Sequence, residues 1–448
     1  MKKHFVRIAA ALFLMVFSAA FTGCGGDGSS TSEIGESVSE GNSDETETLR
    51  SERSRELSPG VTDSDLEELV AGNSGFALGL YHALRNQEDN LFYSPYSISL
   101  ALAMTYAGAG GETEQEMGTA CHFTLPRERL HPAFNALDLE LAERGENAEG
   151  QDGNGFRLNI ANSIWGQKGH SFLPDFLDVL ARNYGAGMRL TDFINTPEES
   201  RTVINDWASE KTGGRIEDLI PENVISDMTR LVLINAIYFS AAWSSPFQEE
   251  LTRDSDFYLS DGTDITVPMM RQTDHLYYGE GENYQAAELM YEGRETSMVI
   301  LLPRPGLFEE FENSLTSERL NEILDGFEYK SVELNMPQFS YESDSVSLRE
   351  TLSRMGMPTA FSWPGADFSG MDGTYDLFIG NVLHKSFISV DEAVTEAAAA
   401  TAVVFADSGI SPEEPTDFTV SRPFIFFIRD IDTNAILFAG RILNPVSR

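Results

Sequence analysis

The hydrophobic and polar positions along the chain predict strands and helices in irregular order. Alternating or almost wholly apolar runs of strand length occur at Phe156–Trp165, Leu231–Phe239, Ile265–Met270, Ala286–Met290, Met298–Leu302, Val332–Phe339, Phe378–Val390, Phe424–Arg429 and Ala435–Ile442. No repeat of the length found in solenoids or propellers is present. Strands and helices that do not alternate regularly indicate an α+β fold rather than a series of βαβ units.

Apolar residues at helical spacing predict helices at Asp65–Asn86, Leu100–Ala107, Asn205–Leu219, Leu315–Leu324 and Ser347–Met355. We expect the first of these to be interrupted at Gly72–Gly75 and the third to stop at the glycine pair 213–214. Pro95 marks a helix start, where its missing N–H costs nothing. Ser94 and Ser97 flank this proline, and both are of a residue type that caps helix N-termini.

The stretch from Phe387 to Asp407 combines two opposing local preferences. It contains neither proline nor glycine, so all of it is compatible with a strand inside a sheet. Between Val394 and Ala406 the single charged residue is Glu396, and the alanine run after it has helix propensity. The local pattern is therefore compatible with either a surface helix or a strand. The Ser, Gly and Pro residues that follow predict an exposed turn.

The first residues have the layout of an export signal. Basic residues precede an apolar run, Ile8–Phe21, that is shorter than the roughly 20 residues needed to span a membrane. The tetrad ending in Cys24 resembles a bacterial lipobox, whose cysteine is lipidated; an ordinary cleaved signal peptide is the alternative. We expect a signal peptide over residues 1–23, an acidic flexible tether over 24–60 and one folded domain over 61–448. These segments predict an exported lipoprotein, anchored at the cell surface or in the periplasm.

Acidic residues dominate the charge of the chain. Asp and Glu number 71 against 31 Lys and Arg, which gives a formal net charge of -40, and six of the basic residues are lysines. Such a charge disfavours nucleic acid as a partner, and it disfavours membrane contact other than through a lipid anchor. An acidic, lysine-poor surface is expected to suit high salt, where screening relieves self-repulsion.

The sequence lacks motifs for catalysis or cofactor binding. It has no Gly-x-Ser-x-Gly elbow, His-Glu-x-x-His, Cys-x-x-Cys or phosphate-binding loop. The seven histidines show no metal-ligand spacing, and Cys121 is most simply read as a buried apolar residue. We therefore expect a protein that is not an enzyme and that holds no cofactor and no metal ion.

Several segments, in order, resemble the serpin family. The resemblance extends from about Leu66 to Val446 and is densest at Asn90–Ile98, Ile204–Leu219, Leu231–Phe247, Met269–Pro303, Glu392–Thr401 and Arg422–Pro445. It implies one domain with three β-sheets, about nine helices and an exposed reactive-centre loop. In this family a cleaved loop is known to insert into the central sheet as an added strand.

The resemblance assigns roles to residues at matching positions. Ser94, Ser97, Asn235 and His384 correspond to a polar cluster beneath the point where the central strands part, and Trp243 to a tryptophan at the top of that opening. An amide such as Asn235 inside an apolar strand needs partners, because an unpaired one costs about 1–3 kcal/mol. The loop's hinge corresponds to Glu392, Ala393, Val394, Thr395, Glu396, Ala397, Ala398, Ala399, Ala400 and Thr401.

The implied activity is suicide-type inhibition of a serine protease. Counting without gaps from Glu392 places the scissile bond at Ser408-Gly409, whose small residues suit an elastase-like or subtilisin-like target. A bond one or two residues away remains open; cleavage at Phe405-Ala406 would instead suit a chymotrypsin-like protease, and cleavage at Asp407 an Asp-specific one. We expect the inhibitor to be a monomer.

Alternation along the hinge decides which residues would enter the sheet. If the hinge forms a strand, Thr395, Ala397, Ala399 and every second residue after them share one face. We expect this face to point into the protein, where small side chains fit between existing strands. Val394 stands where inhibitory serpins usually carry glycine, and valine is the stiffer residue there. A non-inhibitory binding protein, or a mere protease substrate, is therefore the alternative function.

Overall fold

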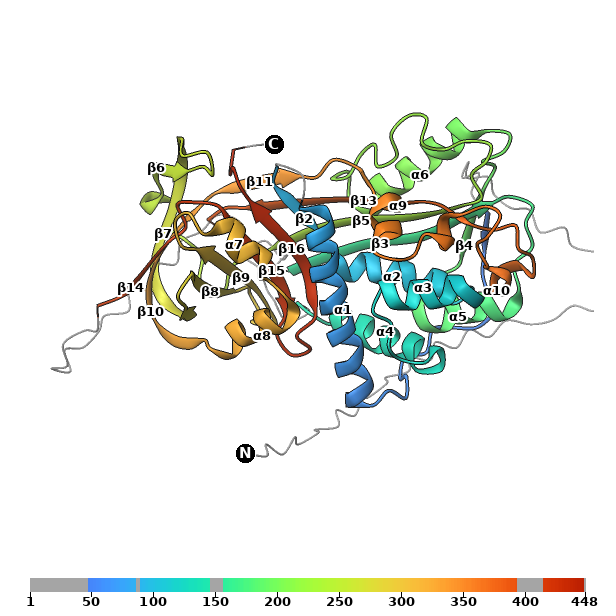
Figure 1. Cartoon of the computed structure of the whole chain (residues 1–448), viewed down its shortest axis with the longest axis horizontal. Coiled ribbons are helices and arrows are strands. Elements are labelled where there is room, and N and C mark those ends of the chain that lie inside the picture. Colours follow the sequence, from blue (N-terminus) through green and yellow to red (C-terminus); the bar gives the residue numbers. More distant parts are fainter. Residues whose placement is uncertain (1–46, 86–88, 146–155, 393–413, 447–448) are drawn as a thin grey trace, which may run out of the picture. The chain divides into compact units, whose positions relative to one another are not determined.

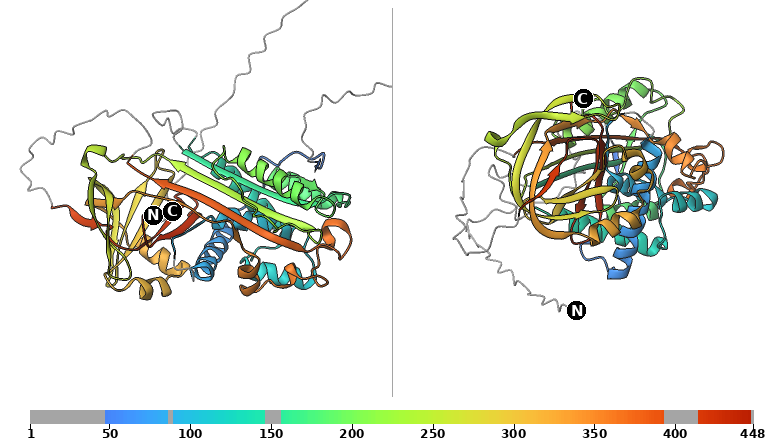
Figure 2. Two further views of the ribbon diagram at one scale, coloured as in Figure 1. Left: turned by 90° about the horizontal axis from the view of Figure 1, so that it is seen from above. Right: turned by 60° about the vertical axis from the view of Figure 1, so that its left-hand side comes forward.

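Two hydrogen-bonded sheets organise the part of the chain that the computed structural model describes, residues 47–85, 89–145, 156–392 and 414–446. The central sheet has seven strands in the order β1 (Glu47–Leu49), β4 (Met188–Thr191), β3 (Phe156–Gln167), β5 (Leu231–Ala241), β13 (Ile379–Val390) and β11 (Phe339–Glu342), with β12 (Val346–Ser347) also on β13. Its long strands β3, β5 and β13 run side by side when the sheet is seen from above (Figure 2, left).

The second sheet has nine strands. Their order is β14 (Thr416–Thr419), β10 (Glu328–Pro337), β7 (Asp264–Glu280), β8 (Tyr284–Met290), β9 (Thr296–Pro303), β15 (Phe424–Asp430), β16 (Ile436–Ile442) and β2 (Leu91–Tyr93), with β6 (Arg253–Tyr258) also on β7. Strand β7 pairs with β6 through its first half and with β8 through its last residues. Because β7 pairs with β6, β8 and β10, all of these strands belong to one sheet, and the described residues form two hydrogen-bonded sheets where three were expected.

Ten α-helices lie within the described residues. They are α1 (Asp63–Leu84), α2 (Pro95–Tyr106), α3 (Gly111–Ala120), α4 (Arg127–Ala142), α5 (Pro174–Tyr184), α6 (Pro197–Lys211), α7 (Phe308–Asn313), α8 (Ser317–Asp325), α9 (Arg349–Arg354) and α10 (Ser369–Asp372), with short 3-10 turns at Glu249–Leu251 and Thr359–Phe361. None of them is both long and apolar enough to span a membrane. The mixture of sheets and helices is the expected α+β fold.

Helices cover both faces of the central sheet (Figure 1). Helix α2 is buried along its whole length because it packs between β3 and β5 on one side and β16 on the other. Helix α6 lies over the opposite face, on a separate small apolar cluster that includes Trp165, Ile204 and Val232. The central strands are therefore enclosed from both sides, as their apolar sequences require.

Helix α1 corrects one prediction. It continues through Gly72–Gly75 without the expected interruption. A Cβ at position 72 would lie 2.4 Å from the backbone oxygen of His122, and one at position 75 would lie 2.9 Å from its Nδ1. These glycines allow close packing of the residues around His122 and do not end the helix.

Two other predicted elements have different bounds. Helix α6 begins at Pro197, before the predicted start at Asn205, and it ends at Lys211, close to the glycine pair 213–214 where the sequence predicted a stop. Pro at the first helical position explains the earlier start. Strand β7 extends to Glu280, ten residues beyond the predicted end at Met270, because Arg271–Tyr278 pairs in register with β10.

The N-terminal tether prediction, residues 24–60, also changes. Glu47–Leu49 forms strand β1, which extends the central sheet by pairing with β4. Farther along, Arg55 donates to Asn135 and Asp138 of α4, and the Glu56 N–H donates to the Arg182 carbonyl. Residues 47–60 are therefore held against the domain by hydrogen bonds that their polar composition did not reveal. Residues 1–46, including the predicted signal peptide and Cys24, lie outside the described residues.

Candidate functional site

The seam between β5 and β13 is the centre of the candidate site. These two strands are parallel neighbours, and His384 of β13 is paired in register with Asn235 of β5. The chain leaves the sheet after Val390 and is described again from Glu414, before β14 of the second sheet. A segment that folded back from the end of β13 would run antiparallel to both β5 and β13. As an added strand between them, it could form hydrogen bonds with β5 on one side and with β13 on the other.

The residues predicted to form a polar cluster do meet at this seam. Asn235 Nδ2 donates to Ser97 Oγ at 2.6 Å, while His384 Nδ1 bonds Asn235 Oδ1. Ser94 caps α2 by accepting from the Ser97 N–H at 3.2 Å, and its own hydroxyl donates to the Leu437 carbonyl at 2.7 Å. The four side chains are buried and joined to one another, to α2 and to β16.

His384 is held as a neutral imidazole. The Ser94 N–H donates to its Nε2 at 3.4 Å, so the ring proton is on Nδ1 and donates to Asn235. Burial lowers the pKa of His384 from 6.5 to about 3. A second proton would remove the acceptor of the Ser94 N–H and place a charge in the core.

Asn162 of β3 is a member of this cluster that the sequence reasoning missed. Its Oδ1 accepts from Ser97 Oγ at 3.0 Å and from Asn235 Nδ2 at 2.5 Å, and its Nδ2 donates to the Ser97 carbonyl at 3.0 Å. It stands opposite Asn235 in the ladder between β3 and β5. A second amide in a neighbouring predicted strand was the available signal.

Trp243 lies two residues beyond the end of β5, at the upper end of the seam. Its indole stacks on Tyr291 with ring centroids 4.7 Å apart, and its Nε1 donates to the Asp391 carbonyl at 3.0 Å. Asp391 is the first residue after β13. The indole thus contacts the chain at the place where it leaves the central sheet.

Glu392 is an anchor, a role the sequence did not indicate. Its side chain is 7% exposed and accepts hydrogen bonds from the Thr252 hydroxyl and the Gln338 amide. Its carbonyl accepts from the Phe247 N–H at 3.0 Å. Two segments distant in sequence, 247–252 and the one that contains Gln338, therefore hold the last described residue before the loop.

The remaining predicted site residues lie outside the described residues. They are the hinge from Ala393 to Thr401 and the scissile pair Ser408 and Gly409. Among the residues that are described, no group of three or more side chains is arranged to hold a metal ion. Cys121 is buried, and burial raises the pKa of its thiol.

Comparisons with known proteins agree with this architecture. The family model for serpin (serine protease inhibitor) matches residues 71–445. An uncharacterised serpin-like protein of Thermococcus kodakarensis is 40% identical over 378 residues, which cover 84% of this chain and 86% of that protein. The leukocyte elastase inhibitor of Sus scrofa is 40% identical over 392 residues, 85% of this chain and all of the inhibitor. The chain belongs to the serpin family.

Solved serpin structures share the fold. The thermophilic serpin tengpin in its native state matches with a TM-score of 0.75 and 30% identity, over 88% of this chain and 97% of tengpin. Uncleaved ovalbumin matches with a TM-score of 0.75 and 25% identity, over 84% of this chain and all of ovalbumin.

Proposed function

We propose that this serpin inhibits serine proteases by inserting its cleaved reactive-centre loop between β5 and β13. The single observation that carries the proposal is the seam, where two parallel strands pair directly and the chain leaves the sheet at the end of one of them. Support also comes from the names of its relatives, which include leukocyte elastase inhibitors of several mammals. Serpins are generally protease inhibitors and not catalytic enzymes.

The chemical step uses the protease's own nucleophile. The serine oxygen of the protease attacks the Ser408 carbonyl, the Ser408-Gly409 amide bond breaks, and the Gly409 amine leaves with a proton from the protease's base. An ester then links Ser408 to the protease. Insertion of the freed hinge carries the ester-linked protease along the sheet before water can hydrolyse the ester.

New hydrogen bonds supply the driving force. Insertion exchanges the β5–β13 ladder for two ladders, one on each side of the added strand. With about ten residues each gaining roughly 0.5–1.5 kcal/mol net, the gain is on the order of 10 kcal/mol. That gain is comparable with the stability of a whole domain, so the uncleaved protein is a kinetically trapped state.

We infer the cellular location from the N-terminal sequence. We place the protein outside the cytoplasm as a lipoprotein attached through Cys24, with residues up to 46 linking the lipid to the domain. It acts there as a monomer on elastase-like or subtilisin-like proteases. Metabolic labelling with a radioactive fatty acid, lost in Cys24→Ala, tests the attachment.

Electrophoresis in hot detergent tests inhibition directly. Incubation with pancreatic elastase or subtilisin is expected to give a protease–serpin ester that survives boiling, in proportion to lost protease activity. Cleaved serpin together with fully active protease would contradict the proposal.

Two matched loop variants test insertion itself. Ala399→Arg places a large charge on the face predicted to turn inward, and Ala400→Arg places the same charge on the outward face. We expect the first variant to become a substrate, because its charge would have to be buried, and the second to remain an inhibitor. Equal inhibition by both would contradict insertion in this register.

Val394 favours the second candidate function, a non-inhibitory serpin or protease substrate. A stiff residue at the turn of the hinge slows insertion relative to ester hydrolysis. Val394→Gly is expected to lower the number of serpin molecules cleaved per protease inhibited. An unchanged number, with no complex from either form, would favour the second candidate.

A further inference from the structure

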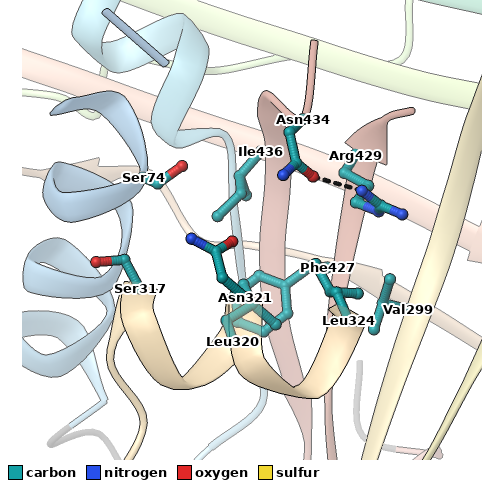
Figure 3. Close-up of a pocket in the computed structure, with 10 residues that line it drawn as sticks. All are labelled: Ser74, Val299, Ser317, Leu320, Asn321, Leu324, Phe427, Arg429, Asn434 and Ile436. Atoms are coloured by element: carbon teal, nitrogen blue, oxygen red, sulfur yellow. Dashed lines mark hydrogen bonds between the residues drawn. The ribbon is translucent and has the colours of Figure 1, made fainter. Parts of the chain in front are cut away.

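The hollow beside α8 is too small to hold a ligand. It lies between α1, α8 and the strands β15 and β16, where Asn434 accepts a hydrogen bond from Arg429 (Figure 3). Its volume is about 10 Å³, room for about one water molecule. A larger recognition feature lies on the surface, at one end of the central sheet.

Four strands of the central sheet meet at that end. Strands β5 and β13 are parallel and begin there, with Ile379 paired in register with Leu231. Strand β3 is antiparallel to β5, and β4 is parallel to β3, so both of them end there: Gly166 pairs with Leu231, and Thr191 pairs with Gln167. This is the lower end of the seam, near α10 in Figure 1 and opposite the end at which the chain leaves β13.

Exposed apolar side chains gather at the lower end of the seam. Among the described residues, eleven large apolar side chains are more than a third exposed, and five of them lie in loops at this end: Leu173, Ile194, Met228, Trp363 and Tyr375. The last three are 57%, 59% and 67% exposed. Single exposed apolar side chains are ordinary, but five of eleven at one end of one sheet indicate a surface that contacts another protein.

Three of the five side chains follow or precede strands that meet at this end. The Ile194 N–H donates to Gln167 Oε1 at 3.1 Å, and Gln167 is the last residue of β3. Leu173 follows six residues after Gln167. Met228 lies three residues before the first residue of β5. All three are therefore beside the ends of β3 and β5.

The other two side chains lie beside the start of β13. Tyr375 is four residues before this strand. Trp363 is farther away in the sequence, but Arg349 ties its loop to β13 by donating to the Gly380 carbonyl at 2.8 Å and to the Phe361 carbonyl at 2.7 Å. The exposed apolar side chains thus flank both strands of the seam.

If the loop inserts as proposed above, its length brings the target protease to this surface. Residues 393–408 number 16, whereas β13 has 12 residues. A strand of 16 residues spans about 53 Å and one of 12 about 40 Å, so Ser408 reaches the lower end of the seam with at most about 13 Å of chain to spare. A protease domain is roughly 40 Å across, so such a short tether holds its surface against the loops at this end.

We propose that the five side chains form a docking surface for the protease that the loop has trapped. A folded protease keeps most of its large apolar side chains inside, whereas a deformed one exposes them. The apolar surface therefore binds the deformed protease better than the folded one, and this difference shifts the equilibrium towards the deformed state. Hydrolysis of the ester is slow in that state because the catalytic residues of the protease are out of position.

The rate at which the complex releases active protease tests the inference. The complex with pancreatic elastase is isolated by gel filtration, and the recovery of elastase activity is followed over days. The lower-end variant, Met228→Ser/Trp363→Ser/Tyr375→Ser, should form the complex in the same yield as the wild type, because insertion between β5 and β13 does not use these side chains. It should then release active elastase at least fivefold faster.

Tyr258→Ser/Tyr277→Ser/Tyr329→Ser is the matched control. It removes three exposed side chains from β6, β7 and β10 of the second sheet, and its release rate should stay within twofold of the wild type. Circular dichroism of both uncleaved variants checks folding, which exposed substitutions are expected to leave intact. Tyr375→Ser alone should already accelerate release, by about twofold, because this side chain is the most exposed of the five.

Equal release rates from the wild type and the lower-end variant, at equal yields of complex, would overturn the inference and leave the inhibition proposal untouched. Absence of any complex with the wild type would contradict insertion, and the docking surface with it. A second copy of the chain is the other possible occupant of this surface. Sedimentation that shows a dimer of the unreacted protein, abolished in the lower-end variant alone, would also overturn the inference.

Discussion

Glu392 shows how one side chain can hold a loop at its root. Both carboxylate oxygens are used, one by the Thr252 hydroxyl and the other by the Gln338 amide, in a nearly buried position. An amide at this position has one acceptor in place of two. In Glu392→Gln, the new NH2 group would face one of these donors.

We therefore expect Glu392→Gln to lower the unfolding free energy of the uncleaved protein by about 1–3 kcal/mol. Urea unfolding measures the change. The exposed Glu333→Gln is the control and should have little effect. Equal stability of the Glu392 variant and the wild type would contradict the anchoring role.

His384 makes stability depend on pH in a defined direction. Its pKa is about 3 in the folded protein, where burial lowers it, against an ordinary value of 6.5. Below pH 6.5 the unfolded chain binds a proton that the folded protein does not, so stability is complete above that pH and falls as the pH falls towards 3. His131, also buried with a pKa of about 3, adds a similar contribution.

Unfolding free energies between pH 6 and pH 5, compared between the wild type and His384→Gln, isolate His384 because the carboxylates titrate in both proteins. Each buried histidine should contribute close to one proton, a slope of about 1.4 kcal/mol per pH unit. His384→Gln should reduce the slope by that amount whatever its effect on absolute stability. An unchanged slope would show that His384 is protonated in the folded state.

The segment from Glu47 to Gly60 is the element whose role differs most from expectation. Arg55 is part-buried and reaches both Asn135 and Asp138, at 2.7 and 2.6 Å, whereas Arg53 is mostly exposed and pairs with Asp178 at 3.4 Å. We expect Arg55→Ala to cost roughly 1–3 kcal/mol, and Arg53→Ala less than about 1 kcal/mol. Thermal unfolding of both variants checks this, and equal midpoints would contradict a structural role for the segment.

Elements with a strong apolar pattern were predictable from the sequence. Strands β5, β9, β13, β15 and β16 follow apolar runs that only a buried strand explains, and their predicted bounds were close. The outer half of β7 was missed, since its exposed residues alternate weakly and its partner β10 holds it in place. A local sequence pattern does not predict pairing between strands that are distant in the chain.

The site was predictable where a polar residue interrupts an apolar strand. Asn235 is such a residue, whereas Asn162 and the partners of Glu392 lie in segments whose own sequences do not indicate a site. Gly72 and Gly75 locally predict a break in the helix, because the residue that requires them, His122, lies in a distant part of the chain. In each case the role of the residue depends on contacts with a distant part of the chain.

The acidic charge of the whole molecule makes its stability depend on salt. The acidic side chains that give the net charge of -40 repel one another in dilute buffer, and 0.1 M salt largely screens this repulsion between charges more than about 10 Å apart. We expect the midpoint of urea unfolding to rise between dilute buffer and molar potassium chloride. A constant or falling midpoint would contradict adaptation of this surface to salt.

Thermal unfolding before and after cleavage of the reactive-centre loop tests the central claim most directly. If the cleaved hinge enters the seam between β5 and β13, added ladder bonds on the order of 10 kcal/mol should raise the midpoint by roughly 10–20 °C. Cleavage can be made with a protease that leaves the rest of the chain intact, and the two forms compared in one buffer. A cleaved protein that unfolds at the same temperature as the uncleaved one would contradict insertion.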